Sequence, residues 1–169
     1  MDKLIPCIIL AGAMLMAPVA NAQLAEPVVG AANADALFSS SDPGLNKNKQ
    51  AAYHIVKDLL ECGHWSEAGK WLTPAYHQHN PMAASGLDSV VNFFTKVMKM
   101  QPKTCPDKMT TKVVAVVAEG PYVTVVYPRD MKNAKDPSKS YTTTWFDMWR
   151  FVDGKADEHW DPATLPTAP

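Results

Sequence analysis

The chain has 169 residues, a formal net charge of −1 at pH 7 and 47% hydrophobic residues. This length allows one domain with its own hydrophobic core. The balanced charge offers no basic excess of the kind that nucleic-acid binding or an anionic membrane surface calls for. We therefore expect neither nucleic acid nor, after removal of the N-terminal segment, a membrane among its partners.

Residues 1–22 are typical of a secretory signal peptide. An apolar run over residues 4–19 is followed by Ala20-Asn21-Ala22, an A-x-A cleavage pattern. The run is shorter than the roughly 20 apolar residues of a membrane-spanning helix. We predict cleavage after Ala22 and a periplasmic or secreted protein; the alternative is an uncleaved anchor.

Two cysteines, Cys62 and Cys105, follow the predicted cleavage site. An even pair in an oxidising compartment favours a disulfide. The alternative is two separate buried thiols.

The composition divides the rest of the chain into three parts. Residues 23–46 are rich in Ala, Ser, Asn, Asp and Pro and predict a linker or flexible arm. Residues 162–169 contain three prolines and predict a disordered tail. The folded domain is expected over residues 47–161.

Helices are expected in the first half of this domain and strands in the second half. Apolar residues at helical spacing predict the helices, and β-branched runs separated by Glu119-Gly120 and Asp153-Gly154 predict the strands. Helices followed by an antiparallel meander indicate an α+β fold with the helices on one face of the sheet. The expected helices are 52–62, 65–72 and 87–98, and the expected strands are 113–117, 122–127, 141–152 and 155–161.

Asp147 is the one acid on an aromatic face of the long predicted strand. Odd-numbered positions from 141 to 151 share this face, because side chains alternate along a strand. A carboxyl group on an apolar wall must find a partner or take up a proton. Asp147 is therefore either a general acid–base group or a structural hydrogen-bond acceptor.

The turn at Asp153-Gly154 decides what faces Asp147. A tight two-residue turn places Trp160 opposite Asp147. A bulge at Gly154 would instead bring His159 and Asp161 to the same face as Asp147. The sequence leaves both alternatives open.

The histidines do not form a recognisable metal-binding motif. His77 and His79 have an H-x-H spacing, and His159 and Asp161 are acceptable ligands, but no H-E-x-x-H helix accompanies them. The sequence also lacks G-x-G-x-x-G and G-x-S-x-G patterns. We predict no metal and no cofactor.

Four motifs in order resemble the SnoaL-like family of the nuclear transport factor 2-like superfamily. They are Y-H-Q-H-N-P at 76–81 with Gly86, V-A-E-G at 117–120, D-M-W-R at 147–150 with D-G-K at 153–155, and E-H-W-D at 158–161. The resemblance covers about residues 47–161. It implies a cone-like α+β roll, in which three N-terminal helices pack on a curved, mixed but mostly antiparallel sheet that encloses a pocket, and it suggests a homodimer.

The resemblance also carries implications for individual residues. Family members include polyketide cyclases, and related pockets serve steroid isomerisation and epoxide hydrolysis. Asn80 and Asp161 are similar to a water-positioning Asn and a catalytic acid of the limonene-epoxide-hydrolase-like branch. The Arg and Asp that this branch carries on a middle strand have no clear match at 123–127. The position similar to Asp147 faces the pocket there, which favours the bulged turn.

The predicted function is a cofactor-free lyase, isomerase or cyclase acting on a small hydrophobic molecule by carboxylate and His acid–base catalysis. The alternative is a non-catalytic ligand-binding or dimerisation module of the same fold, so enzyme activity itself stays open. The predicted catalytic residues are Asp147, His79, His159 and Asp161. The predicted substrate contacts are Asn80, Tyr76, Phe94, Trp145, Trp149 and Trp160.

Overall fold

The computed structural model of the chain describes residues 26–165. The predicted signal peptide at 1–22 and the last four residues of the predicted tail lie outside these residues. Within the described residues, no helix is long and apolar enough to cross a membrane.

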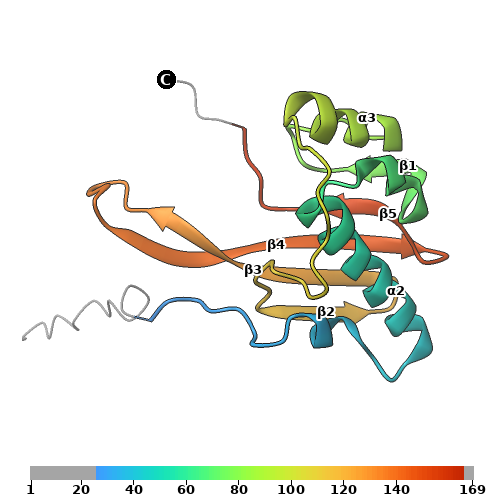
Figure 1. Cartoon of the computed structure of the whole chain (residues 1–169), viewed down its shortest axis with the longest axis horizontal. Coiled ribbons are helices and arrows are strands. Elements are labelled where there is room, and N and C mark those ends of the chain that lie inside the picture. The colour runs from blue at the N-terminus through green and yellow to red at the C-terminus, as the bar shows by residue number, and fades with distance from the viewer. Residues whose placement is uncertain (1–25, 166–169) are drawn as a thin grey trace, which may run out of the picture.

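Five strands form one mixed sheet (Figure 1), which confirms the predicted α+β class. In the strand order β1-β5-β4-β3-β2, β1 pairs with β5 in parallel and every other pair is antiparallel. The strands are β1 Leu72–Gln78, β2 Ala115–Glu119, β3 Tyr122–Lys132, β4 Ser140–Val152 and β5 Lys155–Trp160.

The sequence did not predict strand β1. Pro74 argues against a central strand, because proline lacks the N–H that a sheet needs. In the structure β1 is an edge strand of the sheet. An edge strand tolerates proline where the missing N–H would face outward.

The helices cover one face of the sheet (Figure 1). The side chain of Asp42 caps α2 by accepting a hydrogen bond from the Leu45 N–H at 2.8 Å. Two of the helices, α2 and α3, each continue directly into a π-helical turn. The helical elements are η1 Asp35–Phe38, α2 Pro43–His54, η2 Ile55–Glu61, η3 Trp65–Lys70, α3 Leu87–Asn92 and η4 Phe93–Val97.

Part of the segment expected as a flexible arm is docked on the domain. Phe38 is fully buried and packs edge-on against Tyr53. The backbone N–H of Ala31 donates to the carbonyl of Val113. One large aromatic side chain and several hydrogen bonds therefore hold this stretch, and its average composition does not reveal them.

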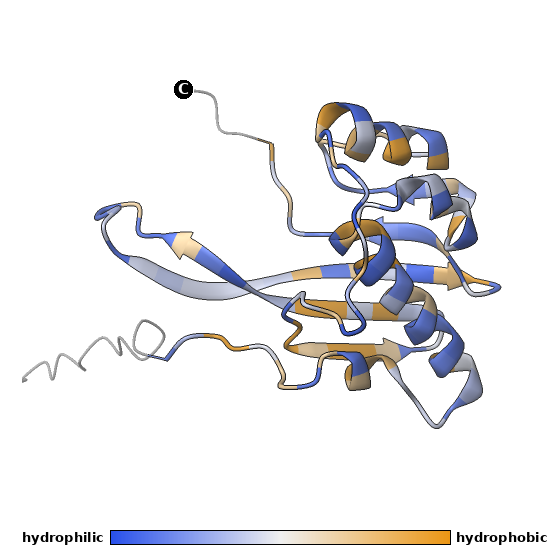
Figure 2. Cartoon of the chain, viewed as in Figure 1, coloured by the Kyte–Doolittle hydropathy of each residue, from blue (hydrophilic) through white to orange (hydrophobic). Residues whose placement is uncertain are grey.

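The hydrophobic core lies between the helices and the inner face of the sheet, the face that the helices cover. Figure 2 shows apolar residues concentrated in the strands beneath the helices, whereas the projecting β3–β4 hairpin is mostly polar. This hairpin pairs from Tyr122 and Arg150 out to Lys132 and Ser140.

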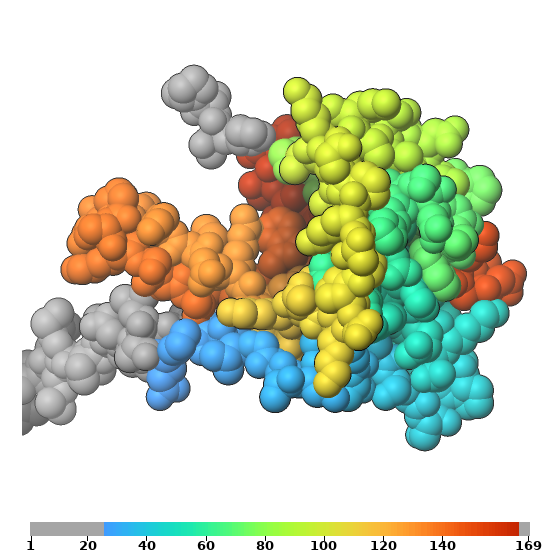
Figure 3. Space-filling model, in the orientation of Figure 1, coloured from blue at the N-terminus to red at the C-terminus, as the bar shows by residue number. Residues whose placement is uncertain are grey.

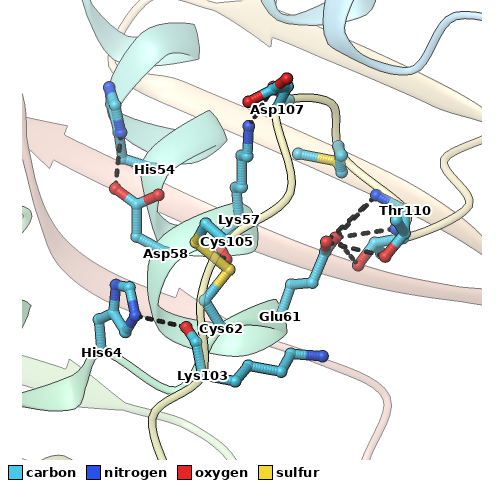
Figure 4. Close-up of a disulfide and its surroundings, with 12 residues drawn as sticks. His54, Lys57, Asp58, Glu61, Cys62, His64, Lys103, Cys105, Asp107 and Thr110 are labelled. Atoms are coloured by element: carbon cyan, nitrogen blue, oxygen red, sulfur yellow. Dashed lines mark hydrogen bonds and ion pairs between the residues drawn. A yellow bond between two sulfur atoms is a disulfide. The ribbon is translucent and has the colours of Figure 1, made fainter.

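Residues 98–114, called the strap here, connect η4 to β2 across the helical side. The predicted disulfide between Cys62 and Cys105 fixes the strap to the end of η2 (Figure 4). Glu61 accepts hydrogen bonds from the backbone N–H groups and hydroxyls of Thr110 and Thr111 at 2.7–3.2 Å. The strap is therefore held by polar contacts as well as by the covalent link.

Candidate functional site

An apolar cavity of about 90 Å³ lies between the helices and the inner face of the sheet. This volume is smaller than the ~150 Å³ of a cavity that accepts benzene. Figure 3 shows the surface hollowed between the yellow strap and the orange β3–β4 hairpin, with β4 at the bottom of the hollow. The cavity is lined by Ile55, Leu60, Trp65, Leu72, Tyr76, Gln78, Asn80, Ala83, Val90, Phe93, Phe94, Asp147, Trp149, His159 and Asp161.

The turn between β4 and β5 combines features of both predicted alternatives. Val152 pairs with Lys155, so Asp153-Gly154 is a two-residue turn, and both turn residues have positive φ. The register then shifts, because Arg150 pairs with Glu158 while the next residue pairs with Ala156. The extra residue is Asp157, so the predicted bulge lies three residues beyond Gly154.

This bulge brings His159 to the inner face. His159 pairs with Trp149, two residues from Asp147, so all three side chains share one side of the sheet. Trp160 pairs with Met148 and therefore points to the outer face. The strand pairing answers the question that the sequence left open.

The parallel pairing of β1 with β5 explains why His79, one of the predicted catalytic residues, is not among the described residues that line the cavity. His77 lies beside Glu158 and Gln78 beside His159, so Gln78 faces the cavity. The ring of His79 lies outside, with Nε2 at 2.8 Å from the Glu158 carboxylate. The reason is alternation: His77 and His79 flank the inward-facing Gln78.

A chain of hydrogen bonds fixes the tautomer of His159. The backbone N–H of Asn80 donates to Gln78 Oε1 at 3.1 Å, so this atom is the amide oxygen. The same oxygen lies 2.7 Å from His159 Nδ1. Because an amide oxygen only accepts, Nδ1 carries a proton.

The other ring nitrogen of His159 faces Asp147. His159 Nε2 lies 3.3 Å from Asp147 Oδ1. With Nδ1 protonated, an unprotonated Nε2 would direct its lone pair at a carboxylate oxygen. The contact is attractive either as imidazolium and carboxylate or as imidazole and carboxylic acid.

Asp147 and Asp161 are both held by further donors. The indole N–H of Trp145 donates to Asp147 Oδ1 at 3.2 Å. The side-chain amide of Asn80 donates to Asp161 Oδ2 at 2.7 Å, and the Ala163 N–H donates to Asp161 Oδ1 at 2.8 Å. Both carboxyl groups are thus held in place in the lining of the cavity.

Two tyrosine hydroxyls lie near these acids. Tyr76 accepts a hydrogen bond from the Trp149 indole N–H at 3.1 Å. Burial raises the pKa of Tyr76, the Trp149 bond opposes this rise, and the charges of Asp147 and Asp161 add to it. Burial and the charge of Asp147 likewise raise the pKa of Tyr127, whose buried hydroxyl has no hydrogen bond of acceptable geometry among the described residues. Both phenols therefore stay protonated.

The structure places the predicted substrate contacts in two groups. Asn80, Tyr76, Phe94 and Trp149 line the cavity. Trp145 and Trp160 lie outside this lining in the described part of the chain: Trp145 stacks under the Arg129 guanidinium at 4.2 Å, and Trp160 stacks on the His79 ring on the outer face. Contact of Asn80, Tyr76, Phe94 and Trp149 with a substrate stays a prediction.

Gln78 is the site residue that sequence reasoning missed. Gln78 lies between His77 and His79 and two residues after the buried Tyr76. Had β1 been recognised as a strand, the alternation of side chains would have placed Gln78 on the inner face. The structure also brings together Asp147, His159 and Asp161, with one ligating atom from each within 4.8 Å of the others.

Helices over one face of a mixed sheet, with carboxyl and imidazole groups in the lining of an apolar cavity, define a small-molecule pocket protein. Residues 56–159 match the model of the SnoaL-like domain, so the chain belongs to the SnoaL-like family. The predicted family is thereby confirmed.

Solved structures support the fold. A candidate SnoaL-like polyketide cyclase from Jannaschia sp. CCS1 is 15% identical with a TM-score of 0.51, covering 73% of this chain and 91% of that chain. A candidate polyketide cyclase from Acidithiobacillus ferrooxidans is 15% identical with a TM-score of 0.50, covering 73% of this chain and 89% of that chain. Among curated proteins, no sequence matches.

Proposed function

We propose that the chain is an acid–base enzyme of lyase, isomerase or cyclase type, acting on a small hydrophobic carbonyl compound. The observation that carries this proposal is the fixed His159 tautomer, whose Nε2 lies 3.3 Å from Asp147 Oδ1 in the lining of an apolar cavity. A positioned carboxyl–imidazole pair contributes typically 10²–10⁴-fold to proton-transfer rates.

In the proposed reaction, Asp147 removes a proton from the carbon next to the substrate carbonyl. The proton moves to the carboxylate, and the C–H electron pair moves into the carbonyl to form an enolate. Tyr76 stays protonated in this environment and donates a hydrogen bond to the enolate oxygen. Return of the proton from Asp147 to another carbon gives isomerisation. Attack of the enolate carbon on a second carbonyl forms the new C–C bond, and the resulting alkoxide takes the proton from Asp147 to complete cyclisation.

The cavity supports a compact substrate or the reactive end of a larger one. Its volume of about 90 Å³ has no room for several fused rings without movement of the wall. The Trp65 and Phe94 rings stack 3.9 Å apart and form one apolar wall. Such a wall excludes water from a developing enolate.

Deuterium exchange tests the proposal without knowledge of the final product. Small enolisable ketones and diketones are incubated with the protein in D₂O, and loss of the α-proton signal is followed by NMR. Asp147→Asn should lower the exchange rate about 10²–10⁴-fold. The matched control is Glu158→Gln, which removes an outer-face acid next to His159 and should leave exchange unchanged.

Two results would contradict the enzyme proposal. The first is equal exchange by the wild type and Asp147→Asn. The second is binding of these ketones without any exchange, which would favour the alternative of a non-catalytic ligand-binding module. Circular dichroism of both variants checks that the fold is retained.

Export and homodimer formation remain part of the proposal. The Cys62–Cys105 disulfide supports an oxidising compartment. Exposed apolar side chains on the outer face of the sheet, Val117, Tyr122, Phe146 and Val152, support a partner surface there. Size-exclusion chromatography with light scattering of Phe146→Lys and wild type would test the dimer.

A further inference from the structure

We propose that Asp147, His159 and Asp161 form a binding site for a divalent transition-metal ion of the Zn²⁺ type. One ligating atom from each lies within 4.8 Å of the others. Imidazole nitrogen with two carboxylate oxygens is an acceptable ligand set for such an ion. This inference departs from the sequence prediction of no metal, which considered the H-x-H pair with His159 and Asp161 but did not include Asp147.

One of the three ligand-atom separations already matches a tetrahedral site, and the three atoms together lie within 4.8 Å. Bonds of ~2.0–2.2 Å to zinc place neighbouring ligand atoms roughly 3.3–3.6 Å apart. His159 Nε2 and Asp147 Oδ1 are 3.3 Å apart. Three protein ligands would leave the fourth position to water or a substrate oxygen, as in catalytic rather than structural zinc sites.

Two of the three ligands are each oriented by a further residue. The proton on His159 Nδ1 is directed to the Gln78 amide oxygen, so Nε2 is the ring nitrogen that faces Asp147 and is free to bind a metal ion when unprotonated. The amide of Asn80 holds Asp161. Metal-ligating histidines characteristically donate their other N–H to such an acceptor, which fixes the tautomer.

The charge balance of the cavity also calls for a cation. Asp147 and Asp161 line it, and no lysine or arginine is among the described residues that do so. The side chains of His159 and Asp147 are only 9% and 13% exposed. A divalent ion bound between the two carboxylates would balance both of their charges.

The outer-face histidines offer an internal control. The His77 and His79 rings lie 4.6 Å apart, and both residues are exposed. Exposed H-x-H pairs capture zinc adventitiously, but Nε2 of His79 is already engaged by Glu158. If zinc binds in the cavity, its affinity must be unchanged when His77 and His79 are removed.

The site shares residues with the proposed function but stands on separate evidence. A metal ion on His159 Nε2 occupies the place of the proton between His159 and Asp147. Zinc should therefore suppress the proposed α-proton exchange. Metal binding itself is measured without turnover, so either proposal can fail alone.

The test uses the full mature chain with its disulfide, dialysed against EDTA. Calorimetric titration with ZnCl₂ should give one equivalent bound by wild type and by the His77→Ala/His79→Ala double variant. Asp161→Asn should bind at least ~10-fold more weakly. Co²⁺ in place of Zn²⁺ should give the intense visible absorption of a four-coordinate ion. Gln78→Leu should weaken metal binding, although it removes none of the three ligands.

The outcomes separate the alternatives. No zinc binding, or binding abolished only in the His77→Ala/His79→Ala variant, would overturn the cavity site. Zinc binding with no ketone exchange at any metal content would support the site and contradict the acid–base enzyme. Ketone exchange by metal-free protein that binds no zinc would support the acid–base enzyme and contradict the metal site. Binding of tetramethylammonium but not zinc would assign the compensating charge to an organic cation and overturn the metal proposal.

Discussion

The two faces of the sheet carry the same kinds of side chain in different surroundings. On the inner face, His159 lies beside Asp147, and on the outer face His79 lies beside Glu158. The inner pair is 9% and 13% exposed, whereas the outer pair is 39% and 18% exposed. Composition would not distinguish these two acid–histidine pairs.

The difference lies in what surrounds each pair. Arg150 contacts Glu158 at 3.1 Å, so a fixed cation already balances the outer acid. No lysine or arginine among the described residues lines the inner cavity. An exposed, balanced pair contributes little free energy, while a shielded pair without a fixed cation is available to exchange a proton or hold an ion.

The largest expected difference between the faces is in packing. Trp149 is 2% exposed on the inner face and Phe146 is 41% exposed on the outer face of the same strand. Trp149→Ala should lower the free energy of unfolding by about 3–5 kcal/mol, because it opens a cavity in the core. Phe146→Ala should cost well under ~1 kcal/mol. Urea denaturation measures both, and equal costs would show that the outer face is also packed.

The disulfide is expected to contribute next. Cys62 and Cys105 are 43 residues apart in sequence, and their link holds the strap over the inner side. The Cys62→Ala/Cys105→Ala variant should lose about 2–4 kcal/mol of unfolding free energy. Glu61 should still hold the strap, so the near-ultraviolet circular dichroism of the native state should persist. Loss of that signal would mean that the covalent link alone positions the strap.

Neighbouring residues at the end of β1 sharpen the comparison between the two faces. Gln78→Leu removes the acceptor that fixes the His159 tautomer, so α-proton exchange should fall about 10–100-fold. Gln78→Glu keeps an acceptor oxygen and should restore most of the rate. His79→Leu, on the opposite face, should not change it. An effect of His79→Leu as large as that of Gln78→Leu would contradict the assigned faces.

The smallest expected effect concerns the acid that holds the strap. Burial opposes ionisation of Glu61, but the hydrogen bonds from Thr111 and Thr110 outweigh it and lower the pKa of Glu61. A lowered folded-state pKa gives stability that is present above the unfolded-state pKa of ~4.3 and is lost as pH falls through the folded-state pKa.

Glu61→Gln should therefore cost about 1 kcal/mol at neutral pH and less at pH 3. Unfolding free energies at pH 6.5 and pH 3 measure this difference. Glu119→Gln removes an exposed carboxylate and is the matched control. A cost for Glu61→Gln that grows as the pH falls would contradict the assignment.

The sequence was informative wherever a local pattern carried the signal. Continuous β-branched runs marked β2 and β3, and helical spacing marked the segment that begins at Leu87. Strand β1 escaped prediction because Pro74 is compatible with a strand only at a sheet edge, and edge position is a property of the whole sheet. The docked segment around Phe38 escaped because its contact is with Tyr53, in another element.

The sequence by itself determined the fold class, the aromatic face that carries Asp147, and the pair of cysteines. Periodicity and residue type encode these features within a few residues of chain. Only the tertiary structure decided that His159 and Gln78 face Asp147 while His79 and Trp160 face away. A shift of one residue in pairing exchanges the two faces of a strand, and that shift depends on the bulge at Asp157 and on the parallel neighbour β1.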